Sequence, residues 1–195
     1  MTDYSQSGEQ IAILEYFKGK PPGKFLDIGA YDGKVFSNTL ALVELGWSGV
    51  CVEPSPGAFT KLQTRHAKRG DIKLLNAAVG NAPGIIQMFE SPDALSTTEK
   101  GNWAKWKDKT TFMPIYVYRA TPQELFDFFG FNFDFINIDT EGTSADIFLR
   151  LPFTKLGTSL WCVEHDGKKK EIVEKAEWLG FNLLLTNGEN VILGK

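Results

Sequence analysis

Short runs of apolar residues alternate with longer, helix-like segments through most of this chain. The runs have the length and composition of buried strands and cover residues 24–28, 49–53, 72–75, 84–89, 133–139 and 159–164. Segments 34–45, 54–68 and 168–179 carry apolar residues at helical spacing, with Phe36, Leu40 and Val43 as the expected inward stripe of the first. This alternation predicts an α/β fold with a mostly parallel sheet and helices on both faces.

The two ends of the chain carry their own signals. Residues 11–17 are amphipathic and predict a helix within an N-terminal helical extension over residues 1–22. Near the other end, Asn187-Gly188 separates apolar runs at 181–185 and 190–193, which is a hairpin signal. The last strand should therefore run antiparallel to the rest of the sheet. We expect a single domain over residues 1–195, a usual size for one core.

Composition limits the partners and the compartment. The chain has 21 basic and 24 acidic residues, whereas a nucleic-acid binder normally has a basic excess, so we expect no nucleic-acid partner. No apolar run approaches the roughly 20 residues that span a bilayer, and we expect no membrane insertion. Cys51 and Cys162 lie in apolar runs and are interpreted as reduced core thiols. These features favour a cytoplasmic protein.

A glycine turn follows the first strand over Asp27-Ile28-Gly29-Ala30-Tyr31-Asp32-Gly33. Such a turn between a strand and a helix can hold a nucleotide-like ligand at the carboxyl edge of the sheet. Its spacing is G-x-x-x-G, and Tyr31 occupies the position where a dinucleotide fingerprint needs glycine. This disfavours a nicotinamide oxidoreductase. Asp27 suits a cationic ligand better than a pyrophosphate, and S-adenosyl-L-methionine is such a ligand.

The expected cofactor residues extend over the first three strands. Asp27 would face the ammonium group, and Glu53, at the end of the second strand, would accept hydrogen bonds from the ribose hydroxyls. Asn76 would meet the adenine edge, and Ala77 and Ala78 would leave room for the ring. The complete predicted set is Asp27, Gly29, Ala30, Tyr31, Gly33, Glu53, Pro54, Asn76, Ala77, Ala78 and Asp139. The competing interpretation is that the glycines only permit tight strand–helix packing and that Glu53 is a solvated strand end.

Five motifs occur in a fixed order between residues 24 and 167: F-L-D-I-G-A-Y-D-G, V-E-P, N-A-A-V-G, I-D-T-E-G and V-E-H. In this order the chain resembles the FkbM-family S-adenosylmethionine-dependent methyltransferases. The resemblance implies a Rossmann-like class I methyltransferase fold with seven strands. It also implies O-methylation of a hydroxyl on a sugar, a glycan or a glycosylated small molecule. The chain departs from the family in having Asn137 where a lysine usually stands, and Thr143-Ser144 after the I-D-T-E-G glycine.

Methylation of a hydroxyl requires alignment and benefits from a general base. The candidates are His165, Asp139 and Glu141, which follow two strands that end at the same edge of the sheet as the glycine turn. We place His165 first, because a neutral imidazole accepts a proton at neutral pH, and Asp139 second. The alternative for His165 is a hydrogen-bonded strand-end histidine. A further alternative is that these three residues hold Mg²⁺ or Mn²⁺, which the sequence permits but does not favour.

The segment over residues 91–112 is polar, lacks a clean period and carries Trp103 and Trp106. A segment of this length is often a functional lid, so we predict a lid or acceptor-binding insert. Trp103 and Trp106 would stack on a sugar, or alternatively would only pack the loop against the sheet. Ser96 and Arg119 are also expected in the acceptor pocket.

Two other functions compete with sugar methylation. One is a non-catalytic S-adenosylmethionine-binding module, which would tolerate the loss of His165, Asp139 and Glu141 together. The other is a methyltransferase acting on nucleic acid. Enzymes that methylate nucleobase amines usually carry an asparagine- or aspartate-proline-proline-aromatic motif, and Asp139-Thr140-Glu141-Gly142 stands at that place here.

Overall fold

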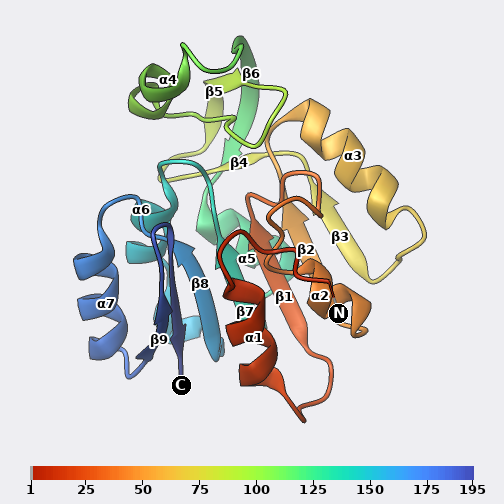
Figure 1. Ribbon diagram of the computed structural model, residues 1–195, viewed down its shortest axis with the longest axis vertical. Coiled ribbons are helices and arrows are strands. Elements are labelled where there is room, and N and C mark those ends of the chain that lie inside the picture. The colour runs from red at the N-terminus through yellow and green to blue at the C-terminus, as the bar shows by residue number, and fades with distance from the viewer. Residues whose placement is uncertain (1) are drawn as a thin grey trace.

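A seven-stranded sheet forms the centre of the computed structural model, which describes residues 2–195 (Figure 1). The strand order is β3-β2-β1-β7-β8-β10-β9. Neighbouring strands from β3 to β8 are parallel, and β10 is antiparallel to both β8 and β9, as the hairpin signal predicts. The strands are β1 (Lys24–Ile28), β2 (Ser48–Val52), β3 (Ile72–Leu75), β7 (Phe135–Ile138), β8 (Leu160–Glu164), β9 (Asn182–Thr186) and β10 (Asn190–Gly194).

Helices cover both faces of this sheet, so the predicted fold class is confirmed. Side chains alternate between the faces: Phe25 packs with one set of helices and its neighbour Leu26 with the other. The first set is α1 (Glu9–Phe17), α2 (Leu40–Glu44) and α3 (Pro56–His66), and the second is α5 (Pro122–Phe129), α6 (Ser144–Leu149) and α7 (Lys169–Trp178). A 3₁₀ turn, Phe153–Lys155, precedes β8. No helix within residues 2–195 has the length and apolar character to cross a membrane.

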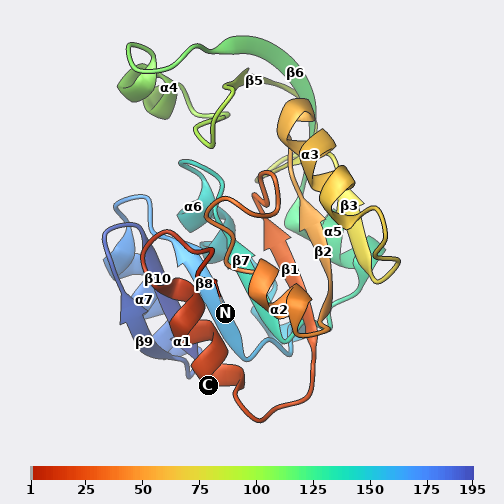
Figure 2. The ribbon, with the colours of Figure 1, turned by 45° about the vertical axis from the view of Figure 1, so that its right-hand side comes forward.

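A second, three-stranded sheet with strand order β4-β6-β5 rises from the end of β3. It is formed by β4 (Ala78–Val79), β5 (Gly84–Glu90) and β6 (Met113–Ala120), and α4 (Lys100–Trp106) lies in the connection between β5 and β6. Figures 1 and 2 both place α4 above the ends of the central strands of the main sheet. The predicted lid segment thus belongs to a structure that stands over the carboxyl edge.

The predicted helix over residues 34–45 is wrong in its first half, because α2 begins only at Leu40. Polar side chains bind the backbone ahead of it: Asp32 Oδ1 accepts hydrogen bonds from the N–H groups of residues 34 and 35, at 2.7 and 2.8 Å. Phe36 has a left-handed φ of 56° and is 49% exposed rather than inward-facing. Leu40 and Val43 are buried as expected.

Both cysteines are free thiols in the core, as predicted. Cys51 lies on β2 and Cys162 on β8, and burial raises the pKa of each thiol well above its ordinary value. They pack with α1, α2 and α3 on the same face of the sheet.

Candidate functional site

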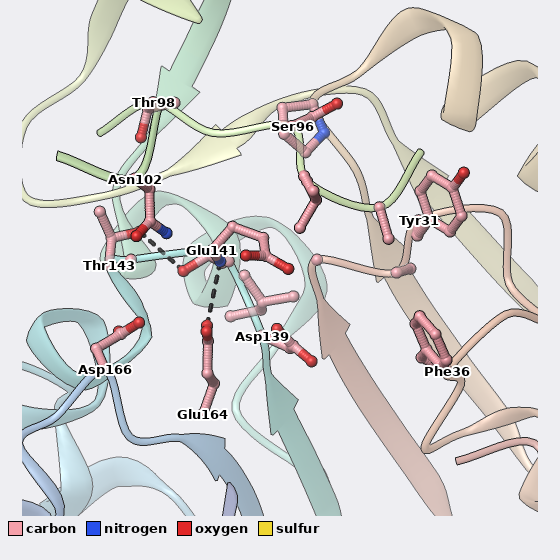
Figure 3. Close-up of a pocket in the computed structure, with 18 of the residues that line it drawn as sticks. Tyr31, Phe36, Ser96, Thr98, Asn102, Asp139, Glu141, Thr143, Glu164 and Asp166 are labelled. Carbon is pink, nitrogen blue, oxygen red and sulfur yellow. Dashed lines mark hydrogen bonds between the residues drawn. The ribbon is translucent and has the colours of Figure 1, made fainter. Parts of the chain in front are cut away.

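A cavity of about 770 Å³ opens at the carboxyl edge of the main sheet. Its wall combines the glycine turn, the ends of β2, β7 and β8, and part of the segment over residues 91–112. Figure 3 shows Tyr31 and Phe36 on one side of this cavity and Glu141, Glu164 and Asp166 on the other. A cavity of this size suits a ligand as large as a nucleoside derivative.

The two glycines of the turn allow different close approaches, one to a backbone and the other to a side chain. Gly29 has a φ of 92°, and a Cβ built on it would lie 1.6 Å from the backbone oxygen of Asp139. Gly33 has a φ of 71°, and a Cβ there would lie 2.7 Å from the side chain of Leu62. Gly29, Ala30 and Tyr31 line the cavity, whereas Gly33 does not. Gly33 therefore fits the packing interpretation, and Gly29 serves both packing and the cavity wall.

Glu53 is held at the cavity by the backbone. Its Oε2 accepts a hydrogen bond from the Tyr31 N–H at 2.8 Å, and its Oε1 accepts one from the Ser55 N–H at 2.8 Å. Burial raises the pKa of Glu53 to about 7, against the lowering effect of these two hydrogen bonds. Each carboxylate oxygen has a further lone pair, so Glu53 can accept two hydrogen bonds from a diol.

Asn76 does not line the cavity, although Pro54, Ala77 and Ala78 do. Its Nδ2 donates to the backbone oxygens of Glu53 and Pro54, at 2.7 and 3.1 Å. The structure thus places Asn76 as a support for the end of β2, away from the adenine position that the sequence predicts for it.

Asp27 is buried below the glycine turn, where it accepts hydrogen bonds at both oxygens. Asn137 Nδ2 donates to Oδ1 at 2.9 Å, and Thr39 Oγ1 donates to Oδ2 at 2.6 Å. Burial raises the pKa of Asp27, and these two bonds act in the opposite direction. Asn38 lies beside this pair and lines the cavity. The sequence analysis did not select Asn38. The signal that could have found it is the polar stretch 37–39 inside an expected helix.

Four carboxyl groups gather where β7 and β8 end. Burial, followed by repulsion from neighbouring carboxylates, raises the pKa of Glu141 to about 8 and that of Glu164 to about 7. Burial, with the neighbouring charge of Glu164, also raises the pKa of Asp139 well above its ordinary value. Glu164 Oε2 accepts a hydrogen bond from the Glu141 N–H at 3.1 Å (Figure 3). It accepts another from Ser144 Oγ at 2.8 Å. Sequence reasoning did not select Glu164 or Asp166, although Glu164 lies in the V-E-H motif.

His165 lines the same cavity, but its ring is already engaged. Its Nδ1 accepts a hydrogen bond from the Gly167 N–H at 3.2 Å. In the neutral ring this contact places the proton on Nε2, which makes Nε2 a hydrogen-bond donor. This hydrogen bond is the one expected of a strand-end histidine with a structural role, which was the alternative to catalysis.

Asp139, Glu141 and His165 all line the cavity. Within residues 2–195, no group of three or more histidine, cysteine, aspartate or glutamate side chains has the spacing to hold a metal ion. Asp139, Glu141 and His165 thus do not have the arrangement of a metal site in this structure.

The segment over residues 91–112 contributes Ser96 and Trp106 to the cavity wall. Thr97 Oγ1 donates to the backbone oxygen of Glu141 at 2.7 Å, which ties the segment to the acidic side of the cavity. Trp103 does not line the cavity and stacks on Phe89, with ring centroids 5.1 Å apart. For Trp103 the structure therefore supports the packing interpretation.

Arg119 also lies outside the cavity wall. It belongs to β6, where its Nε donates to the backbone oxygen of Ala82 at 2.6 Å. Its side chain also covers Gly80, since a Cβ on that glycine would lie 2.8 Å from Arg119 Cδ. The structure thus places Arg119 as a brace of the second sheet, outside the cavity where the acceptor was expected to contact it.

Strained backbone is concentrated at the cavity. Among residues 2–195, four residues other than glycine have positive φ angles: Tyr31 (47°), Phe36 (56°), Glu141 (55°) and Asp166 (48°). All four line the cavity. Left-handed conformations of such residues persist where the surrounding structure holds them, and they are found disproportionately at functional sites.

Solved methyltransferase structures share this fold at low sequence identity. The ribosomal protein L11 methylase of Lactobacillus delbrueckii subsp. bulgaricus has a TM-score of 0.51 and 16% identity, over 96% of this chain and 76% of that one. The precorrin-6y C5,15-methyltransferase of Geobacter metallireducens GS-15 has a TM-score of 0.53 and 11% identity, over 95% and 87%. Aeropyrum pernix fibrillarin, in complex with natively bound S-adenosyl-L-methionine, has a TM-score of 0.52 and 12% identity, over 93% and 71%.

The family itself is shown by the sequence. No curated protein matches the chain. The family described as the methyltransferase FkbM domain matches residues 27–178, a span that includes the glycine turn, Glu53 and the acidic groups after β7 and β8. The resemblance found in the motifs is thereby confirmed, and the chain belongs to the FkbM family of S-adenosylmethionine-dependent methyltransferases.

Proposed function

We propose that this protein transfers a methyl group from S-adenosylmethionine to a hydroxyl of a sugar, a glycan or a glycosylated small molecule. The observation that carries this proposal is the group of buried carboxyls with raised pKa values, Asp139, Glu141 and Glu164, in the same cavity as Glu53. Such a group can accept a proton from a hydroxyl beside the methyl donor.

The residues of the cavity fit the cofactor. Glu53 can accept hydrogen bonds from both ribose hydroxyls, and the small side chains of Ala77 and Ala78 leave room for an aromatic ring. The acidic side chains Asp27 and Glu53, on either side of the glycine turn, suit a ligand that carries positive charge better than a pyrophosphate. When bound, S-adenosylmethionine supplies an electrophilic methyl group on a cationic sulfur.

The charge of the cavity wall bears on the acceptor. Lys105 is the one lysine among the described lining residues, against eight acidic side chains. A polyanion entering this cavity would find only one lysine or arginine side chain among these residues, whereas nucleic acids are bound largely through neutralisation of their phosphates by basic groups. An uncharged polyol does not need such neutralisation. The eight are Asp27, Glu53, Glu99, Asp139, Glu141, Glu164, Asp166 and Glu189.

We assign the role of general base to Glu141. Its carboxyl group makes no hydrogen bond within residues 2–195, it lines the cavity, and its raised pKa of about 8 makes its carboxylate a stronger base than an ordinary glutamate. Asp139 and Glu164 would share a proton next to it. His165 would donate a hydrogen bond from Nε2 to the acceptor instead of removing its proton, which reverses the order expected from the sequence.

The remaining lining residues have proposed roles in holding the acceptor. Ser96 and Trp106 lie on the side of the cavity formed by the segment over residues 91–112. The indole of Trp106 offers a flat apolar surface to the C–H face of a sugar, and Lys105 and Lys109 lie over this ring, at 4.7 and 4.6 Å from its centroid. The segment itself would act as the lid.

A transfer assay tests the proposal. The protein is incubated with S-adenosylmethionine carrying a deuterated methyl group and with separate panels of glycans, glycosylated small molecules and RNA. Mass spectrometry then locates the label. We expect one methyl group on a sugar hydroxyl of a glycan or glycoside. Label on RNA alone, or label on a nitrogen atom, would contradict the proposal.

Variants then test the base. Glu141→Gln should lower kcat by at least about 100-fold with little change in cofactor affinity, since a general base contributes roughly 10²–10⁴-fold. His165→Gln, which keeps a hydrogen-bond donor, should have a smaller effect. Glu177→Gln is the control, because Glu177 is exposed on α7 away from the cavity. A larger loss for His165→Gln than for Glu141→Gln would return the role of base to the histidine.

A further inference from the structure

Asn38 Oδ1 is a buried hydrogen-bond acceptor without a partner. Within residues 2–195, four buried side-chain polar atoms lack a partner, on Asn38, Thr158, Trp161 and Asn190, and of these residues only Asn38 lines the cavity. Its side chain is 4% exposed. A buried acceptor without a donor is destabilising, and beside a ligand-binding cavity a bound ligand can supply that donor.

The orientation of the Asn38 amide follows from Asp27. The Asp27 carboxylate is an acceptor only, so the adjacent Asn137 must direct its Nδ2 toward it, as observed at 2.9 Å. Asn137 then presents Oδ1 to Asn38, and Asn38 must direct its own Nδ2 there, at 3.0 Å. The oxygen of Asn38 is left at the end of this chain of bonds. The free end is therefore an acceptor and requires a donor.

The place of Asn38 in the cavity indicates which donor this is. Asp27, Asn137 and Cys162 are register neighbours on β1, β7 and β8, and Asn38 Nδ2 lies 3.6 Å from Cys162 Sγ, so Asn38 sits over these three strands. Glu53, which would hold the ribose, follows β2 on the other side of β1. With its ribose at Glu53, S-adenosylmethionine would extend its amino-acid end across the glycine turn toward Asn38. The α-ammonium is the hydrogen-bond donor of that end.

We infer that Asn38 Oδ1 accepts a hydrogen bond from the α-ammonium group of S-adenosylmethionine, with Asp27 and Asn137 orienting the amide. Asn38 is thus a cofactor-binding residue, and Asn137 is a positioning residue that acts through its hydrogen bond to Asn38. The inference rests on the assignment of the cofactor and is independent of the acceptor.

Calorimetry on the free protein tests this contact without any turnover. The ligands are S-adenosylhomocysteine, the analogue that lacks only its α-amino group, and methylthioadenosine, which lacks the amino-acid end. Asn38→Ala should weaken S-adenosylhomocysteine binding about 10- to 100-fold, the range expected for a hydrogen bond to a charged group. Binding of the deaminated analogue and of methylthioadenosine should change less than about 3-fold.

Asn190→Ala is the matched control, because Asn190 is also a buried asparagine with an unpartnered Oδ1 but lies outside the cavity wall. It should leave all three affinities unchanged. Equal weakening of all three ligands by Asn38→Ala would mean that Asn38 only supports the cavity. Unchanged S-adenosylhomocysteine binding would also overturn the inference. A wild-type protein that binds none of the three would instead contradict the cofactor assignment.

A structure of the wild-type protein with S-adenosylhomocysteine gives an independent answer if Asn38→Ala does not fold. The ammonium nitrogen should lie about 3 Å from Asn38 Oδ1, a hydrogen-bond distance. An ammonium group bonded elsewhere, with Asn38 Oδ1 beyond about 4 Å, would overturn the inference while leaving the cofactor assignment intact.

Discussion

Gly29 is the residue at which two parts of the cavity wall meet most closely. A methyl group at this position would overlap the backbone oxygen of Asp139, 1.6 Å away, and neither backbone can yield without moving a strand end. We expect Gly29→Ala to lower the free energy of unfolding by more than about 3 kcal/mol, measured by urea denaturation.

Gly180→Ala is the control for this substitution. Gly180 has a similar φ of 81°, but nothing lies within 4 Å of its added Cβ. It should cost only about 1–2 kcal/mol, the penalty of a left-handed alanine. Equal losses at the two positions would show that the contact with Asp139 is unimportant.

Glu141 gives the stability of the protein a characteristic pH dependence. Its pKa is raised from 4.5 to about 8, so the folded state holds a proton that the unfolded state releases. Its contribution is complete below about pH 4.5 and is lost as the pH rises through about 8. Glu141→Gln should therefore be more stable than the wild type by a few kcal/mol at about pH 8.5, and nearly equal to it at about pH 5.

Urea unfolding at both pH values measures this difference in the free protein. Glu177→Gln, an exposed substitution, should follow the wild type at each pH. If Glu141→Gln has the same pH slope as the wild type, its carboxyl group is not the one that holds the extra proton.

At the scale of elements, the Thr97 hydroxyl connects the segment over residues 91–112 to the acidic side of the cavity. Thr97 is 1% exposed, and its hydroxyl donates to the backbone oxygen of Glu141 at 2.7 Å. Thr97→Val removes this bond, and the one that the same hydroxyl accepts from the Glu99 N–H at 2.9 Å, with little change in shape. We expect backbone amides of residues 91–106 to exchange about 2- to 12-fold faster, from a loss of about 0.5–1.5 kcal/mol.

Mass-spectrometric hydrogen exchange provides the measurement. Thr64→Val is the control, because Thr64 is exposed on α3 and its hydroxyl bonds only to the Thr60 backbone oxygen of the same helix. Uniformly faster exchange over the whole protein would indicate global destabilisation and would argue against a local tie between residues 91–106 and the acidic side of the cavity.

The elements that the sequence predicted well are runs of apolar residues. The strand over 24–28 has the bounds expected because it is covered on both faces, and the partly buried edge strand over 72–75 also has the bounds of its apolar run. The helix predicted over 34–45 begins too early. Apolar periodicity carries no information on the side chains of Asp32 and Ser37, which accept hydrogen bonds from backbone N–H groups up to the start of α2. The role of Asn38 was hidden for the same reason, since it depends on the direction of bonds that begin at Asp27.

The sequence could likewise place some site residues and not others. Glu53 and the acidic groups after β7 and β8 could be placed from topology, because parallel strands end at one edge of a sheet. Arg119, Asn76 and Trp103 could not be placed, since each points to a neighbouring backbone or ring outside the cavity. Spacing along the chain predicts the strand on which a residue lies. It does not predict which neighbouring side chain or carbonyl group that residue contacts.

At the scale of the whole molecule, Glu9 joins α1 to the hairpin between β9 and β10. Glu9 is fully buried and accepts hydrogen bonds from the Ser7 N–H and from the side-chain amides of Asn187 and Asn190. Burial raises its pKa, but these hydrogen bonds outweigh burial, so the pKa lies below its ordinary value. Its contribution to stability is therefore present above about pH 4.5 and lost as the pH falls.

Glu9→Ala should lower the free energy of unfolding by about 2–4 kcal/mol near pH 7, because it leaves the buried Asn190 amide without an acceptor and the half-buried Asn187 amide with only a 3.4 Å bond to the Ser7 backbone oxygen. Glu15→Ala, on the exposed face of the same helix, should change stability by less than about 1 kcal/mol, since its pairing with Lys18 is solvated. Urea denaturation measures both. Comparable losses for the two variants would mean that α1 does not depend on this junction.

The left-handed backbone at Tyr31, Phe36, Glu141 and Asp166 has a consequence for engineering this protein. Glycine at any of the four would relieve a local conformational penalty of about 1–2 kcal/mol, but it would also remove a side chain from the cavity wall. A screen that selects only for heat resistance should therefore enrich glycine substitutions at these positions, and the variants should be more stable but turn over more slowly. Selection for turnover and selection for heat resistance should favour different residues at these four positions.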